Sequence, residues 1–317
     1  MLLALGALAA GAWTTTDMFT LRDTAYSLSM TTDKVTGAAD PIGHEYHVMY
    51  GLFLLPVLQR AAAAGSPTKL FEIGLGCGMQ YGAGASALLW RKLLPATELW
   101  EADFDARCLI RHKKQLADQG VHTVAGDQSS NSTLSDWIRK SGGGFDAIID
   151  DGSHQSQDIL TSFWMLWPQL KPGGTYFIED LQISRDPKFD NTRGNSPVMD
   201  VLQSWMDQVV IPNLRAPKGT RPSAARAPLA ERQDETQHLG WIHWNKTASN
   251  ERTVAARIKF PAPPGLAFVF CQADGCALGK KPKLPAEAEA LGATLPPSSN
   301  AQAKVQKVSH GKRLQGR

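Results

Sequence analysis

The sequence predicts an α/β fold with a doubly wound, mostly parallel sheet, and three observations support this. Short apolar runs alternate with longer amphipathic ones between Lys69 and Gln182, a glycine-rich segment follows the first run, and acidic residues follow the later ones. This alternation is typical of repeated βα units. The 317 residues, 43% of them apolar and 20% charged, suffice for one core of ordinary domain size, which excludes a disordered or fibrous chain.

Five strands and four helices are predicted in this region. The strands are Lys69–Ile73, Glu98–Ala102, Val121–Ala125, Phe145–Ile149 and Thr175–Ile178, and the helices are Ala85–Leu94, Ala106–Gln119, Thr133–Lys140 and Gln157–Leu170. Lys171-Pro172-Gly173-Gly174 is expected to end the last helix, because proline lacks the N–H donor and glycine accepts positive φ. Thr253–Phe260 and Leu266–Cys271 are predicted as an antiparallel pair that closes the sheet.

Three parts of the chain differ in composition. Residues 1–30 begin with an apolar run, Leu2 to Trp13, which ends in small residues like a secretory signal and is shorter than the roughly 20 residues of a membrane span. We expect the secretory pathway or Golgi lumen, with the cytoplasm as the alternative, and membrane association through this run only. Residues 31–279 form the predicted domain, with a surface insertion at Pro212–Gln237. Residues 280–317 are predicted as a disordered basic tail.

The charge distribution argues against nucleic-acid binding, and the cysteine spacing argues against a zinc site. The net charge is +3, but eight basic and two acidic residues lie from Lys280 onward, so the preceding part carries about −3. Such a body lacks the basic face that a nucleic acid requires, and we expect no nucleic-acid partner. The four cysteines include no pair at zinc-binding spacing. Cys271 and Cys276 could be bridged locally or could be free thiols, and the sequence leaves both open.

A glycine loop follows the first predicted strand. Phe71-Glu72-Ile73-Gly74-Leu75-Gly76-Cys77-Gly78 places glycines at alternating positions, so that the backbone can turn sharply and approach a ligand closely. Ligands of open α/β sheets bind beyond the carboxyl ends of the strands, where this loop lies. Met79 stands where a dinucleotide-binding loop has its third glycine. A nucleotide-like ligand other than a nicotinamide dinucleotide is therefore expected.

Acidic residues recur at the ends of the next strands. Asp103 ends the second strand, where a carboxylate can accept hydrogen bonds from both ribose hydroxyls, and Asp127-Gln128 follow the third, where an Asp can bind an adenine amino group. Each acid alone is a common helix N-cap. Because three strand ends in register carry the expected chemistry, we favour a nucleotide site.

Two acidic pairs follow the fourth and fifth strands. Asp150-Asp151 precede Gly152-Ser153-His154, and Glu179-Asp180 end the fifth strand. Adjacent strand ends bring these carboxylates together, and their repulsion favours a bound divalent cation such as Mg²⁺. His154 would stand beside the cation as a base, since an imidazole with a pKa of ~6.5 is substantially neutral at physiological pH. The alternative is that these acids cap the following helices.

The stretch from Lys69 to Leu181 resembles class I methyltransferases through FEIGLGCG, EADFD, GDQ, IIDDGSH and FIEDL. IDDGSH followed by IEDL is similar to the metal-dependent macrolide-sugar O-methyltransferases of the mycinamicin type, a family also labelled cephalosporin hydroxylase-like. The resemblance implies a Rossmann-like, seven-stranded sheet with an N-terminal helical cover. It extends to Thr32-Asp33-Lys34 with His44, Tyr46 and Tyr50, a segment that covers the active site in that family.

The resemblance also implies roles for individual residues. S-adenosylmethionine would be bound by Glu72, Gly74, Gly76, Gly78, Asp103, Asp127, Gln128 and Asp150. Mg²⁺ or another divalent cation would be bound by Asp151, Glu179 and Asp180, with His154 as the catalytic base.

The resemblance implies an O-methyltransferase that acts on a hydroxyl of a sugar or glycosylated small molecule. A catechol-type phenol O-methyltransferase and a noncatalytic protein that binds a glycan or a partner on the same fold stay as alternatives. The segment after Leu181, with Trp241 and Trp244, matches no known pattern, and these tryptophans either stack on a sugar or cap the sheet. A homo-oligomeric assembly also stays open.

Overall fold

The computed structural model describes residues 16–27, 32–35, 44–79, 82–189, 191–192, 196–210, 242–243, 255–256 and 260–283. The signal-like run Leu2–Trp13, the insertion Pro212–Gln237, Trp241, Trp244 and the tail from residue 284 onward lie outside the described residues. The chain divides into two units, Met1–Pro282 and Lys283–Arg317. All elements described below belong to the first unit.

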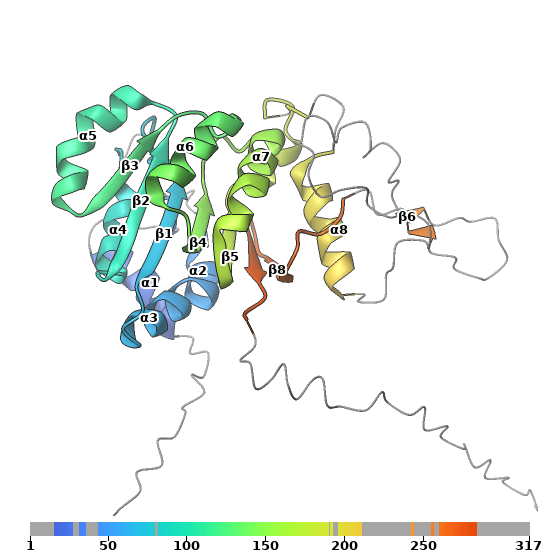
Figure 1. Cartoon of the computed structure of the whole chain (residues 1–317), viewed down its shortest axis with the longest axis horizontal. Coiled ribbons are helices and arrows are strands. Elements are labelled where there is room, and N and C mark those ends of the chain that lie inside the picture. Colours follow the sequence, from blue (N-terminus) through green and yellow to red (C-terminus); the bar gives the residue numbers. More distant parts are fainter. Residues whose placement is uncertain are drawn as a thin grey trace, which may run out of the picture. The chain divides into compact units, whose positions relative to one another are not determined.

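Seven strands form one sheet in this unit. They are β1 (Thr68–Ile73), β2 (Thr97–Asp103), β3 (Val121–Ala125), β4 (Phe145–Asp150), β5 (Leu170–Ile178), β8 (Leu266–Cys271) and β9 (Cys276–Lys280). Their order is β3-β2-β1-β4-β5-β9-β8 (Figure 1), with β1 to β5 parallel and β9 antiparallel to both of its neighbours, β5 and β8. The order reverses between β1 and β4, which is where doubly wound sheets bind their ligands. The predicted fold class is confirmed.

Helices cover both faces of the sheet. They are α1 (Thr16–Ser27), α2 (His47–Phe53), α3 (Leu55–Ala63), α4 (Ala85–Leu93), α5 (Ala106–Asp118), α6 (Asn131–Ser141), α7 (Ser156–Leu166) and α8 (Val198–Val210), with 3₁₀ turns η1 (Trp167–Gln169) and η2 (Leu181–Arg185). Alternate side chains of a strand point to opposite faces. Leu70 and Phe177 accordingly pack with α1 to α5, whereas Phe71 and Tyr176 pack with α6 to α8. Among the helices that the structure describes, none has the length and apolar character to cross a membrane.

One predicted strand pairing, that of Thr253–Phe260 with Leu266–Cys271, is wrong. The partner of β8 is Cys276–Lys280, not Thr253–Phe260. Of that predicted strand the structure describes Ala255–Ala256, which form β7 and pair with β6 (Ile242–His243) in a separate sheet, and Phe260, which lies outside any strand. β9 was not predicted because Gly279 and Lys280 resemble the start of the basic tail in composition. A turn at Gln272–Gly275 reverses the chain, so that β9 pairs with β5.

The Lys171–Gly174 segment does not stop a helix, because α7 ends at Leu166 and this segment lies inside β5. Its glycines lie where the pairing of β4 with β5 is irregular. Gly173 has φ +85°, and a Cβ on Gly174 would lie 2.7 Å from the carbonyl oxygen of Asp146. Glycine is therefore required here by close backbone approach rather than by helix termination.

All four cysteines of the sequence are paired in the structure. Cys271–Cys276 closes the turn between β8 and β9, which the sequence had left open. Cys77–Cys108 was not foreseen, and it joins the glycine loop after β1 to the first turn of α5, with Cα atoms 5.9 Å apart. This disulfide fixes the loop that the sequence assigns to the cofactor.

The two disulfides should differ in their contribution to stability. Loop-closure entropy predicts about 4 kcal/mol for Cys77–Cys108, which spans 31 residues, and about 2 kcal/mol for Cys271–Cys276, which spans 5. We expect paired Cys→Ser substitution at the first bridge to lower the free energy of unfolding by more than substitution at the second. Urea denaturation of both double variants checks this order, and equal losses would contradict the loop-length argument.

Candidate functional site

The glycine loop approaches the end of β4 closely. A Cβ on Gly74, whose φ is +109°, would lie 2.0 Å from the carbonyl oxygen of Asp151, so no other residue fits there. Asp103 holds the loop from the other side, because its Oδ2 accepts a hydrogen bond from the Leu75 N–H at 3.1 Å. A Cβ on Gly78 would meet nothing within 4 Å. The loop is therefore anchored at Gly74 and Leu75 and, through its disulfide, at Cys77, with open space beside Gly78.

The other residues predicted to bind the cofactor fall into two groups. Asp127 is half-buried after β3, where its Oδ1 accepts from the Ser129 N–H at 2.8 Å. Gln128 and Asp150 are buried and bonded to each other, with Gln128 Nε2 donating to Asp150 Oδ1 at 3.0 Å. Gln128 also accepts from the Ser153 N–H at 2.7 Å and so positions the turn before His154. The cofactor roles of these residues stay predictions.

Asp150 is the buried centre of a polar network. Ser162 and Tyr176 donate to its Oδ2 at 2.5 and 3.1 Å, and Gln128 donates to its Oδ1. Burial raises the pKa of Asp150 to about 6, although these three hydrogen bonds oppose the shift. The Asp150 side chain thus links the end of β4 to α7 and to β5, one residue before Asp151.

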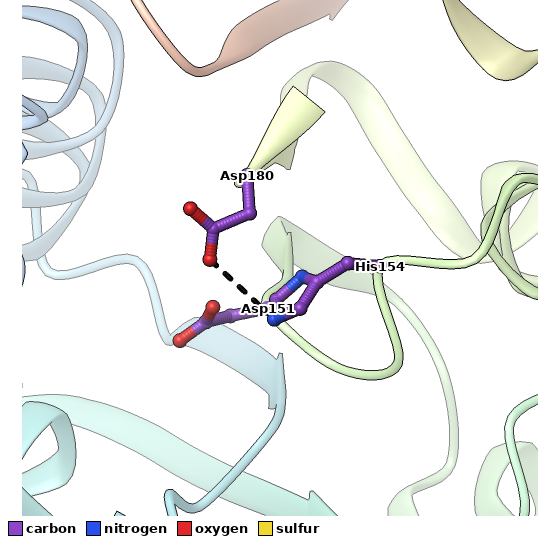
Figure 2. A group of neighbouring side chains, drawn as sticks. All are labelled: Asp151, His154 and Asp180. Atoms are coloured by element: carbon purple, nitrogen blue, oxygen red, sulfur yellow. Dashed lines mark ion pairs between the residues drawn. The ribbon is translucent and has the colours of Figure 1, made fainter. Parts of the chain in front are cut away.

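Asp151, His154 and Asp180 converge at the carboxyl ends of β4 and β5 (Figure 2). One potential ligand atom of each lies within 4.8 Å of the others, and His154 Nε2 lies 3.4 Å from Asp180 Oδ2. Burial lowers the pKa of His154 despite the nearby Asp180, whereas His154, Gln182 and His44 lower the pKa of Asp180 against the opposing effect of burial. The imidazole is therefore neutral at physiological pH, beside an ionised carboxylate.

Three non-glycine residues of the described chain have positive φ, and all three lie in this region: His154 (57°), Asp180 (53°) and Asp274 (68°). Asp274 Oδ2 lies 3.0 Å from His44 Nδ1, and His44 Nε2 lies 3.1 Å from Asp180 Oδ1. Left-handed backbone at side chains larger than glycine is unfavourable and concentrates at functional sites. Two of these three residues, His154 and Asp180, are therefore also members of the group of potential cation ligands.

Glu179 lies in a second group, which the sequence did not separate from the first. Glu72, Asp151 and Glu179 also lie within ligand-bridging distance, so Asp151 is shared between the two groups. The buried ammonium of Lys34 contacts Asp151 and is 2.6 Å from Glu179 Oε2 and 3.7 Å from Glu72 Oε1. The structure brings Asp151 near Asp180 in the first group and near Glu179 in the second, and the ammonium of Lys34 lies among the acids of the second group.

The segment before the sheet supplies two tyrosines to these acids. Tyr50 is fully buried on α2 and its hydroxyl donates to Glu179. Tyr46, just before α2, donates to Asp180 Oδ1 at 3.2 Å and accepts from the Asp180 N–H at 2.9 Å. Together with His44 and Lys34, these side chains show that the segment lies over the acid cluster, as the resemblance implied.

Lys34 does not balance the acidic charge. Burial alone would lower its pKa, but Asp151 and Glu179 raise the pKa of Lys34 well above its usual value. Burial nevertheless raises the pKa values of Asp151 and Glu179, the latter to about 7. Glu101, beside Glu72 in register across β1 and β2, has its pKa raised by burial and by Glu72. Lys34 alone therefore does not keep all of these buried acids ionised, and their ionisation favours a further cation.

The first group fits a divalent cation. Asp151 and Asp180 offer carboxylate oxygens at neighbouring strand ends, and oxygen ligands suit Mg²⁺. His154 Nδ1 is buried without a hydrogen-bond partner, so the imidazole is not committed at that atom. Glu179 is engaged by Lys34 and Tyr50 and would have to leave them to reach a cation bound between Asp151 and Asp180.

The fold is the Rossmann-like fold of methyltransferases. The structure matches the mycinamycin-pathway methyltransferase MycE, solved in complex with Mg and SAH, with a TM-score of 0.52 and 19% identity over 88% of this chain and 60% of that one. A second MycE structure, which also contains mycinamycin VI, matches with a TM-score of 0.50 and covers 85% and 57% of the two chains. At this identity the likeness concerns the fold.

In sequence, the chain is similar to sugar O-methyltransferases. It is 32% identical to the 8-demethyl-8-alpha-L-rhamnosyl tetracenomycin-C 2'-O-methyltransferase of Streptomyces olivaceus, over 57% of this chain and 46% of the relative. It is 31% identical to the mycinamicin VI 2''-O-methyltransferase of Micromonospora griseorubida, over 44% and 35%. The chain thus spans less than half the length of these curated relatives, and no family model matches it.

Proposed function

We propose that this chain is an S-adenosylmethionine-dependent O-methyltransferase that acts, with a divalent cation, on a hydroxyl of a sugar or glycosylated small molecule. One observation carries the proposal: Asp151, His154 and Asp180 converge at the same sheet edge as the glycine loop, whose Gly74 touches the backbone of Asp151. A base, a set of cation ligands and a loop for a nucleotide-like ligand therefore adjoin each other.

The glycine loop and its supports would hold the methyl donor. Gly74, Gly76 and Gly78 provide the close backbone approach, while Asp103, anchored to the Leu75 N–H, would meet the ribose and Asp127 the adenine. Bound S-adenosylmethionine would supply an electrophilic methyl group. Because the Cys77–Cys108 disulfide and Asp103 fix the loop, little ordering entropy remains to be lost on binding.

Asp151 and Asp180, with Glu179 after release from Lys34, would hold the divalent cation. Such a cation lowers the pKa of an alcohol and orients its oxygen. His154 would then take the hydroxyl proton. If its Nε2–H donates to Asp180 Oδ2, the lone pair lies on Nδ1, the atom without a partner. Asp180 would stabilise the imidazolium that results, and His44 and Tyr46 keep Asp180 in place.

Calorimetry tests the binding part of this proposal. We expect S-adenosylmethionine to bind the full chain when Mg²⁺ is present, and absence of binding would instead favour a noncatalytic protein on the same fold. Mass spectrometry of paired acceptors, a rhamnoside and a catechol, tests the substrate class. Methylation of the catechol alone would point to a phenol methyltransferase and contradict the sugar assignment.

Removing the metal should abolish turnover. Exhaustive treatment with EDTA followed by desalting is expected to reduce methyl transfer to background, because His154 alone would face a hydroxyl of unperturbed pKa. Added Mg²⁺ should restore the rate. Circular dichroism before and after chelation serves as the control for folding. Undiminished transfer in the chelated protein would refute the metal requirement.

We also propose an oxidising compartment, such as the lumen of the secretory pathway. Support comes from the pairing of all four cysteines, because disulfides persist in such compartments and are rare in the cytosol. Alkylation of the protein isolated from its native cells, without prior reduction, should label no cysteine. Labelling of all four would indicate a reducing compartment instead.

A further inference from the structure

Lys34 lies between the two sites that methyl transfer would require, the acid cluster and the glycine loop. Its side chain is buried, with 1% of its surface exposed. The ammonium contacts Asp151 and lies 2.6 Å from Glu179 Oε2, while residues 32–34 together line a cavity beside the glycine loop. A displacement of the Lys34 side chain would therefore change both sites at once.

The cavity beside the glycine loop is small. Its volume is about 10 Å³, which is at the lower limit for a single water molecule. Residues 32–34 line it together with Gly74, Gly76 and Asp151. Gly74 and Gly76 are glycines that the cofactor would approach, whereas the space beside Gly78 is open. A ligand that reaches along the loop from Gly78 to Gly74 therefore needs residues 32–34 to move.

The segment of residues 32–34 also has a link to Asp180. The Asp33 carbonyl accepts a hydrogen bond from the His44 N–H at 2.9 Å, and His44 Nε2 lies 3.1 Å from Asp180 Oδ1. Together with the two contacts of the Lys34 ammonium, this link makes the position of the segment depend on the three carboxylates that would bind the metal.

A divalent cation would compete with Lys34 for the same oxygens. Both oxygens of Glu179 are engaged, Oε2 by Lys34 and Oε1 by Tyr50, and Asp151 contacts the ammonium through Oδ2. Two cations that share Asp151 would also repel each other, and the divalent ion carries the greater charge. Binding of Mg²⁺ to these carboxylates would thus displace the ammonium and release residues 32–34 from the acids.

We propose that Lys34 couples the two sites. A divalent cation replaces its ammonium at Asp151 and Glu179, and the release of residues 32–34 gives the cofactor access to Gly74 and Gly76. This inference rests on the proposed function, because it presumes that the acids bind a metal and that the loop binds S-adenosylmethionine. Lys34 is then a positioning residue. Either ligand favours binding of the other, since coupling between two sites is reciprocal.

The sign of the coupling separates this mechanism from a direct effect of charge. S-adenosylhomocysteine has one ammonium and one carboxylate, so it carries no net charge and nearby Mg²⁺ neither attracts nor repels it through net charge. S-adenosylmethionine has an additional sulfonium and would be repelled by nearby Mg²⁺. Tighter binding of both in the presence of Mg²⁺ therefore requires a change in the protein.

Calorimetry on the full chain measures the coupling. We expect Mg²⁺ to lower the Kd of S-adenosylhomocysteine at least about fivefold in the wild type. In Lys34→Met, this Kd should be the same with and without Mg²⁺, and Mg²⁺ should bind more tightly because its competitor is gone. Lys114→Met removes an exposed lysine that pairs with Asp118 and is the matched control, which should keep the full coupling. A direct contact between Mg²⁺ and the ligand would leave the coupling intact in Lys34→Met and would overturn the role of Lys34.

Chemical labelling tests the movement in the wild type, so that the result does not depend on whether Lys34→Met folds. Acetylation with sulfo-NHS-acetate, followed by mass spectrometry of peptides, should modify Lys34 only when Mg²⁺ is present, because the buried amine then becomes accessible. Lys114, whose side chain is 88% exposed, should react at the same rate under both conditions.

The possible results distinguish this inference from the proposed function. If Mg²⁺ and S-adenosylhomocysteine both bind, but Lys34 stays unreactive or the two affinities are independent, the role of Lys34 is overturned and the methyltransferase proposal stands. If neither S-adenosylhomocysteine nor S-adenosylmethionine binds the wild-type chain under any condition, the proposed function itself is overturned. If Mg²⁺ does not bind, the metal requirement is overturned together with the role of Lys34.

Discussion

Lys34→Met is expected to lower the free energy of unfolding by about 3–5 kcal/mol, because it leaves buried carboxylates without their counter-charge. The Lys34 ammonium contacts Asp151 and Glu179, and Glu72 lies 3.7 Å away. Removal of one partner of a buried ion pair destabilises the folded protein by more than the intact pair stabilised it, because the remaining charge stays desolvated. Urea denaturation in metal-free buffer measures the loss.

Two further variants make this prediction specific. Lys34→Arg keeps the charge and should lose less stability than Lys34→Met. Lys114→Met removes an exposed lysine that pairs with Asp118 on α5, and it should change stability little. Added Mg²⁺ should recover part of the loss in Lys34→Met, because a divalent cation would offset the same carboxylates. Wild-type stability in Lys34→Met would show that these acids carry no net charge in the folded protein.

Asp151→Asn should reduce kcat/KM for methyl transfer by at least about a hundredfold, equivalent to about 3 kcal/mol of transition-state stabilisation. Asp151 is the residue common to both groups of potential ligands. The amide keeps the shape of the side chain and leaves Lys34 paired with Glu179, so the fold should persist. The loss should therefore fall on the chemistry rather than on stability.

Calorimetric titration with Mg²⁺ separates the two effects. Asp151→Asn should bind Mg²⁺ more weakly than the wild type but should bind S-adenosylmethionine with similar affinity when the latter is measured alone. Asp118→Asn, an equivalent change on the exposed face of α5, serves as the control and should alter neither quantity. Undiminished Mg²⁺ affinity in Asp151→Asn would exclude Asp151 as a ligand.

The sheet was predictable because its signals are local. Val121–Ala125 was predicted to the residue, and the strands at Lys69, Glu98 and Phe145 differ from β1, β2 and β4 by one residue at one or both ends. The convergence of Asp151 and Asp180 followed from a general property of parallel sheets, namely that neighbouring strands end at one edge. No tertiary knowledge was needed for either result.

Lys34 was not predicted as part of the acid cluster, because its contact with Asp151 joins residues 117 apart in sequence. The expectation that repulsion among the acids favours a divalent cation did not consider a cation from the chain itself. Glu101 was also missed, although an acid within the apolar run Leu99–Ala102 was a visible sign of a buried charge network.

The Cys77–Cys108 disulfide could have been found by the argument that placed the acids. Cys77 follows the end of the first strand, and Cys108 begins the helix after the second, so the two adjacent strand ends bring them together.

The turn that carries Asp274 has a consequence for how the protein matures. His44 and Asp274 are 230 residues apart, yet their side chains meet beside Asp180. A ribosome-bound chain that has released β1 to β5 can already form most of the parallel sheet, but it still lacks the residue that orients His44. The chain of contacts from Asp274 through His44 to Asp180 is therefore complete only after the β8–β9 hairpin has docked against β5.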